Sequence, residues 1–162
     1  MLYDTHIHTR FSTDSRMTID EAAVRGRELG LGLTVTEHMD LDFPQPQAFI
    51  FDVDEYFRVY GPYRSDTVLL GIEIGMRPDL VRENAALTAG HPFDYVIGAI
   101  HVVDKIDIYQ EEFYASRPKT EVYGHYLATM RACLASYDCI DSLGHIDYIA
   151  RYARYPDPEL YY

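Results

Sequence analysis

Short apolar runs alternate with longer amphipathic stretches along the chain. The apolar runs are rich in leucine, isoleucine, valine and threonine, the composition typical of strands. They predict five strands, at residues 1–8, 31–38, 67–75, 94–103 and within 139–149. The amphipathic stretches predict helices at 18–30, 77–90 and 119–137, and the proline-dotted segment 43–65 predicts part loop and part helix.

Helix-terminal signals support two of these helices. Thr18 and Glu21 have the spacing of a capping box, and Gly30 stands where a helix C-terminus favours glycine. Pro78 is predicted near the first position of the helix at 77–90, where a proline costs no hydrogen bond.

The order strand, helix, strand predicts parallel pairing and an α/β fold in one domain over residues 1–162. Five strands suit an open sheet and are too few to close a TIM-type barrel, which needs about eight. The length allows a sizeable core.

The charge of the chain limits its partners. A formal net charge of −12 argues against binding to nucleic acid or to anionic membranes, which need a basic face. A small anionic substrate is compatible with this charge, because a pocket sets its own local field.

The sequence also predicts the compartment. No apolar run is long enough to span a membrane, and "MLYDTH" lacks a signal-peptide pattern. We therefore expect a cytoplasmic protein in which Cys133 and Cys139 stay reduced.

Histidines gather at the predicted carboxyl ends of the strands. In a parallel α/β fold these ends share one rim, where ligands bind. Chance placement of this kind is improbable, and only His91 and His125 lie elsewhere. The residues at the rim are His6, His8, Glu37, His38, Glu73, His101 and His145.

The stretch "YDTHIHTRFSTDS" (3–15) indicates what this rim binds. His6 and His8 are two apart on a strand, so both imidazoles point to the same face, and Asp14 in the following turn can fold back over it. Nitrogen and oxygen donors without thiolates suit zinc, iron or manganese. The five rim histidines, Glu73 and Asp14 are seven candidate ligands, too many for one four-coordinate ion. They predict a multinuclear site in which Glu73 bridges two ions, of the kind that activates water and binds phosphoryl oxygens.

Five motifs together resemble the polymerase and histidinol phosphatase (PHP) superfamily, and most closely its bacterial histidinol-phosphate phosphatases. They run in the family's order across nearly the whole chain. The motifs are "DTHIHTRFSTDS" (4–15), "TEHMD" (36–40), "GIEIG" (71–75), "GAIHVV" (98–103) and "GHIDYIARY" (144–152). The resemblance implies an irregular (β/α)7 barrel, of which this chain would supply about the first five β/α units as a partial barrel.

The resemblance also implies a cluster of two to three divalent ions and a phosphomonoesterase of histidine biosynthesis. A metal-bound hydroxide would hydrolyse L-histidinol phosphate to L-histidinol and phosphate, with Asp14, Glu73 and His101 at the catalytic centre. The implied ligands are His6, His8, Asp14, His38, Glu73, His101 and His145.

Further residues around these motifs are candidates for contact with the substrate. Arg151 matches an arginine typical of the phosphatase branch and is predicted to hold phosphate, and Arg16 and Arg154 are additional candidates. Glu37 either orients His38 or is a polar residue of the rim, and we favour the second role. Asp147 either faces the pocket or caps the following helix.

One departure from the family pattern concerns the C-terminal side. Family members carry a late Asp-x-His pair of ligands, whereas this chain has no histidine beyond His145. The chain is therefore predicted to be a fragment, or to lack one edge of the barrel. An exposed sheet edge favours association, so we expect a homo-oligomer that covers the open side.

Two other functions remain open. The chain could be a PHP phosphoesterase for another small phosphate or for a nucleotide, or a non-catalytic metal-binding domain that lacks the late ligands. A Rossmann-type nucleotide site is disfavoured, because "HIHTRFSTDS" replaces the glycine fingerprint after the first strand.

Overall fold

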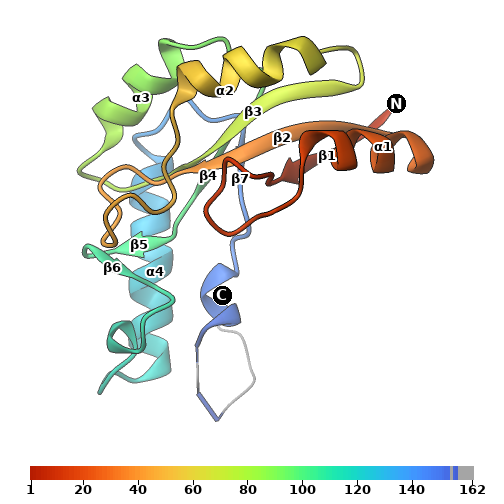
Figure 1. The fold of residues 1–162 in the computed structure, drawn as a ribbon. Coiled ribbons are helices and arrows are strands. Elements are labelled where there is room, and N and C mark those ends of the chain that lie inside the picture. The colour runs from red at the N-terminus through yellow and green to blue at the C-terminus, as the bar shows by residue number, and fades with distance from the viewer. Residues whose placement is uncertain (154, 157–162) are drawn as a thin grey trace.

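A parallel five-stranded sheet forms the centre of the structure (Figure 1). The computed structural model describes residues 1–153, 155 and 156. Its strands, in the spatial order β1-β2-β3-β4-β7, are β1 (Leu2–Ile7), β2 (Leu31–Met39), β3 (Val68–Gly75), β4 (Val96–Ala99) and β7 (Ser142–Leu143). Neighbouring strands all pair in parallel, which confirms the predicted α/β class.

Four α-helices accompany the sheet (Figure 1). They are α1 (Ile19–Leu29), α2 (Val53–Tyr60), α3 (Val81–Ala89) and α4 (Lys119–Leu134). A two-stranded antiparallel hairpin, β5 (Val102–Val103) with β6 (Ile106–Asp107), follows β4. Short 3-10 helices lie at Gly61–Tyr63, Glu111–Phe113 and Tyr148–Arg151.

The sheet curls into a partial barrel, as the PHP resemblance implied, with the apolar core on its outer side. Alternate residues of β3 explain this arrangement, because successive side chains of a strand point to opposite faces. Leu70 and Ile72 are fully buried within the core clusters, whereas Glu73 points to the other face. The face that carries Glu73 is therefore the inner one.

Two groups of helices cover the core. Ile19 of α1 and Tyr56 of α2 pack with Val35 and Leu70 of the sheet. The second cluster joins Ile72 and Ile74 of β3 to the buried face of α4, which presents Val122, Tyr126, Met130 and Cys133. The two clusters fix the curvature of the sheet and so the position of its inner face.

The predicted ends of α1 are confirmed. Thr18 Oγ1 accepts a hydrogen bond from the backbone N–H of Glu21, and the Glu21 carboxylate accepts from the backbone N–H of Thr18, which completes the capping box. Gly30 ends the helix with a φ of 68°, a left-handed conformation that favours glycine.

Three predicted elements differ from the structure. The run 94–103 is not one strand, because β4 ends at Ala99 and the chain then enters the β5–β6 hairpin. The helix predicted at 119–137 ends at Leu134, whereas the strand predicted within 139–149 is present as Ser142–Leu143. Pro78 lies before α3, whose N-cap is Leu80, because the intervening turn is closed by the Leu80 N–H and the carbonyl of Arg77.

Three further expectations concern the cysteines, membrane-spanning helices and the edges of the sheet. Cys133 and Cys139 are free thiols, as predicted. Among the described residues, no helix is long and apolar enough to span a membrane. Strands β1 and β7 form the two edges of the described sheet, and a homo-oligomer that covers the open side stays a prediction.

A buried hydrogen-bond network joins the end of β3 to α3 and to the segment after α4. The hydroxyl of Tyr137 donates to the carbonyl of Arg77 at 2.8 Å and accepts from the backbone N–H of Arg77 at 3.1 Å. Asn84 Nδ2 donates to the same hydroxyl at 3.0 Å and to the carbonyl of Gly75 at 3.1 Å. One phenol therefore holds two distant segments beside the carboxyl end of β3.

Replacement of this hydroxyl tests its contribution to stability. Tyr137→Phe leaves a buried carbonyl and two buried N–H donors without their partner, so we expect the free energy of unfolding to fall by about 1–3 kcal/mol in urea denaturation. Tyr109→Phe is the matched control, because Tyr109 is 59% exposed. Equal unfolding midpoints for the two variants would contradict this prediction.

Candidate metal centre

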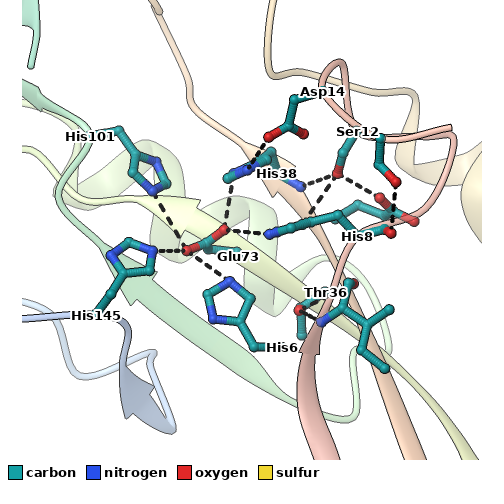
Figure 2. Close-up of polar contacts among 12 residues, drawn as sticks. His6, His8, Ser12, Asp14, Thr36, His38, Glu73, His101 and His145 are labelled. Atoms are coloured by element: carbon teal, nitrogen blue, oxygen red, sulfur yellow. Dashed lines mark hydrogen bonds and ion pairs between the residues drawn. The ribbon is translucent and has the colours of Figure 1, made fainter. Parts of the chain in front are cut away.

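Five imidazoles surround the carboxylate of Glu73 (Figure 2). The imidazole cluster consists of His6, His8, His38, His101 and His145. Glu73 itself is 0% exposed. Its Oε1 lies 3.2 Å from His6 Nε2 and 3.0 Å from His145 Nε2, and its Oε2 lies 3.4 Å from His8 Nε2.

The two remaining imidazoles are nearly buried. His38 Nδ1 lies 3.0 Å from Glu73 Oε2, and His101 Nε2 lies 3.6 Å from Oε1. Asp14, which belongs to the loop between β1 and α1, lies 3.6 Å from His38 Nε2. The predicted return of Asp14 over the rim is therefore present in the structure.

The strand ends bring these side chains together. Parallel pairing places His38 directly beside Glu73 in register, so both point to the inner face. The residues come from every strand of the sheet: His6 and His8 from β1 and its end, His38 from β2, Glu73 from β3, His101 from the end of β4, and His145 from the end of β7.

Asp40 supports His101 from behind. Its Oδ1 accepts a hydrogen bond from His101 Nδ1 at 2.8 Å, which turns Nε2 toward Glu73. The carboxylate reaches this position because Gly75 has no side chain, since a Cβ there would lie 2.1 Å from Asp40 Oδ1. A carboxylate behind a histidine is the usual support of a metal ligand.

Burial and proximity shift the pKa values of these groups in opposite directions. Burial raises the pKa of Glu73, but the neighbouring imidazoles of His101, His145 and His38 outweigh it and hold that pKa well below its usual range. Burial lowers the pKa of His101, yet Asp40 and Glu73 raise it well above normal. Burial and the neighbouring His38 lower the pKa of His8 to about 4.

The donor set of the cluster fits metal ions. Two groups bring their donor atoms within 4.8 Å of one another, and both include the central carboxylate: His6, His8 and Glu73, and His38, Glu73 and His101. Buried polar atoms normally have hydrogen-bond partners. Here Glu73 Oε2 and His101 Nε2 are buried without one among the described residues, as expected of atoms that coordinate an ion.

Two adjoining cavities open over the imidazole cluster. One, of about 470 Å³, includes His38, His101 and Asp14 in its lining, and the other, of about 560 Å³, includes His6, His8 and His145. They share a wall made of Asp14, His38, Tyr148, Arg151 and Tyr152. The cluster is therefore accessible to a small molecule.

The predicted substrate-binding arginines have different positions. Arg151 lines both cavities, and its guanidinium lies 5.6 Å from the centre of the Tyr152 ring. Arg16 is exposed and lines neither cavity. Arg154 lies outside the described residues. Asp147 lines the second cavity and makes no capping hydrogen bond, so it faces the pocket.

Glu37 is not the polar rim residue that we favoured from the sequence. It is 0% exposed and points to the opposite face of β2 from His38. Its carboxylate accepts hydrogen bonds from the backbone N–H of Thr9 at 3.0 and 3.1 Å and from the Ser12 hydroxyl at 2.6 Å. It thereby anchors the loop that carries Asp14.

Two residues of the site were missed from the sequence. Asp40 follows His38 at the spacing i, i+2, which in a strand places both on one face, so this signal was available. Ser12 lies in a polar loop, where the sequence shows no periodic pattern that would distinguish it from its neighbours.

Comparison with known proteins agrees with this geometry. A model of the PHP domain matches residues 4–161. The chain belongs to the PHP domain family. This PHP domain is 50% identical over 162 residues to a Clostridium acetobutylicum protein named "Probable histidinol-phosphatase", covering 100% of this chain and 64% of the relative. It is 30% identical over 167 residues to the histidinol-phosphatase of Lactococcus lactis, covering 97% of this chain and 61% of the relative.

A solved structure supports the same assignment. The PHP domain superposes with a TM-score of 0.91 and 29% identity on the crystal structure of histidinol phosphate phosphatase from Lactococcus lactis, complexed with zinc, L-histidinol and phosphate. The match covers 99% of this chain and 63% of that one. The chain thus spans less than two thirds of the length of these relatives.

The support that Asp40 gives to His101 can be tested directly. Asp40→Ala removes the acceptor behind His101 Nδ1, so we expect added zinc, used as a probe of the candidate centre, to bind about 10–100-fold more weakly than to the wild-type chain. Asp40→Asn keeps an acceptor oxygen of the same reach and should retain most of the affinity. Competition with a chromogenic chelator measures both variants, and unchanged affinity in Asp40→Ala would refute the role.

Proposed function

We propose that this PHP domain binds two to three zinc ions and hydrolyses L-histidinol phosphate to L-histidinol and phosphate. The observation that carries this proposal is the buried Glu73 carboxylate, which five imidazoles surround at the floor of two cavities. The relatives named as histidinol-phosphatases and the zinc-containing neighbour support it.

Two groups of side chains would hold the ions. His6 and His8 form one group and His38 and His101 the other, with Glu73 common to both. Asp14 and His145 add a carboxylate and an imidazole at the edges of the cluster. Zinc bound here would activate water as a nucleophile and neutralise charge on the phosphoryl oxygens.

The protein side chains bind and orient the phosphate ester. Arg151 borders both cavities, where its guanidinium can form the paired hydrogen bonds that a phosphate accepts. Asp14 and His101 line the first cavity, close to where the phosphoryl group would be placed. These positions support the catalytic roles of Asp14, Glu73 and His101.

The rest of the first cavity suits the alcohol part of this substrate. L-histidinol phosphate carries an ammonium group and an imidazole ring beside its phosphate. Aromatic side chains form much of the wall, and these are Phe43, Phe49, Tyr109, Tyr148 and Tyr152. The carboxylate of Asp107 on the same wall complements the ammonium group.

Glu73 provides the test of the metal centre. Glu73→Gln removes the negative charge common to both groups, so we expect zinc content to fall below one ion per chain and phosphate release from L-histidinol phosphate to drop more than about 100-fold. Glu83→Gln, on the exposed face of α3, is the matched control. A Glu73→Gln variant with wild-type turnover would overturn the proposal.

Arg151 provides the test of phosphate binding. Arg151→Ala should raise KM for L-histidinol phosphate about tenfold or more while zinc content stays at the wild-type level, because the guanidinium lines the cavities without belonging to the donor groups. Arg16→Ala should leave KM unchanged, since Arg16 lines neither cavity. Parallel loss of zinc in Arg151→Ala would show a structural role instead.

A further inference from the structure

A buried polar network lies behind the imidazole cluster, on the outer face of β2. Its centre is Glu37, which is fully buried. The backbone N–H and the hydroxyl of Thr9 both donate hydrogen bonds to the Glu37 carboxylate. The hydroxyl oxygen of Tyr60 lies 2.6 Å from Thr9 Oγ1. The buried Ser12 hydroxyl donates a hydrogen bond to Glu37 Oε2 at 2.6 Å.

Ser12 connects this network to the cluster (Figure 2). Its oxygen accepts a hydrogen bond from the backbone N–H of His38 at 3.0 Å and lies 3.4 Å from Nδ1 of His8. A hydroxyl has one hydrogen to donate and two lone pairs to accept with. Each of the three contacts of Ser12 can therefore be assigned a direction.

Counting hydrogens determines those directions. A carboxylate only accepts hydrogen bonds, so the single hydrogen of Ser12 points to Glu37. The backbone N–H of His38 only donates, so it occupies one lone pair of the Ser12 oxygen. The second lone pair faces His8, and the contact is a hydrogen bond only if His8 Nδ1 carries a hydrogen.

We propose that Glu37 and Ser12 are positioning residues that hold His8 as the Nδ1–H tautomer when Nε2 binds a metal ion. A neutral imidazole has one hydrogen, so a hydrogen on Nδ1 leaves the lone pair on Nε2. That nitrogen lies 3.4 Å from Glu73 Oε2 and belongs to the first metal group. Because the Glu73 carboxylate would accept a hydrogen from Nε2 in the absence of an ion, the inference rests on the proposed function.

On the other side of the cluster, a buried carboxylate contacts the Nδ1 of a histidine directly. Asp40 accepts the Nδ1 hydrogen of His101 directly and leaves Nε2 directed at Glu73. Glu37 lies on the opposite face of the sheet and needs Ser12 as an intermediate. Each metal group thus contains one histidine whose Nδ1 contacts a buried carboxylate, directly or through Ser12.

The tautomer can be measured in the zinc-loaded chain. Nitrogen-15 NMR near neutral pH distinguishes Nδ1–H from Nε2–H rings, and His8→Gln assigns the signal. We expect His8 as Nδ1–H in the wild-type chain. A chain that binds zinc with His8 in any other state overturns this inference alone, whereas a chain that binds no zinc overturns the proposed function as well.

Two substitutions test the direction of the chain of hydrogen bonds. Glu37→Met removes the acceptor of the Ser12 hydrogen, which can then turn to His8 Nδ1 and convert the ring to Nε2–H. Ser12→Ala removes the link altogether, so His8 should show a mixture of tautomers. In both variants zinc affinity should fall about 10–100-fold by chelator competition.

Two controls separate this role from a general support of the loop. Ser15→Ala removes a hydroxyl of the same loop, which donates to the carbonyl of His8 at 2.9 Å, and Tyr60→Phe removes a hydroxyl at the far end of the network. Both should keep the wild-type tautomer and zinc affinity. If Ser15→Ala or Tyr60→Phe weakens zinc binding as much as Ser12→Ala, the role is structural and the inference fails.

Discussion

The burial of the Glu73 carboxylate is the constraint on which the site depends. An ionised carboxylate without partners in a protein interior costs several kcal/mol, so its surroundings must supply donors or cations. The curled sheet supplies them from all its strands, because parallel pairing brings every carboxyl end to one rim. The same arrangement that surrounds Glu73 with imidazoles makes its carboxylate common to both candidate metal groups.

Around this carboxylate, a set of buried acids controls the orientation of the imidazoles. Asp40 contacts His101 directly, and its position depends on the absence of a side chain at Gly75. Glu37 acts from the other face of β2 and anchors the loop that carries Asp14. The geometry of the two candidate metal groups therefore depends on carboxylates that do not belong to either group.

The sequence predicted much of this site because strand periodicity and strand ends are local features. His6 and His8 share a face by their spacing alone, and His38 and Glu73 stand at the ends of clear apolar runs. The hairpin after β4 was missed, since its turn uses Asp104 and Lys105 with positive φ values of 52° and 64°, and Lys105 stands where the usual Asp-Gly signal has glycine. The role of Ser12 depends on contacts with three segments, which no local pattern encodes.

The strand order has a consequence for the folding of the chain. His6 and His145 belong to opposite edges of the sheet and lie 139 positions apart, yet their rings stack with centroids 5.5 Å apart. Contacts of such high sequence separation pay their loop-closure entropy before they contribute stability, and they form late in folding. The five imidazoles around Glu73 therefore come together only when β7 has joined the sheet, so the stacking of His6 on His145 reports that both edges of the described sheet are in place.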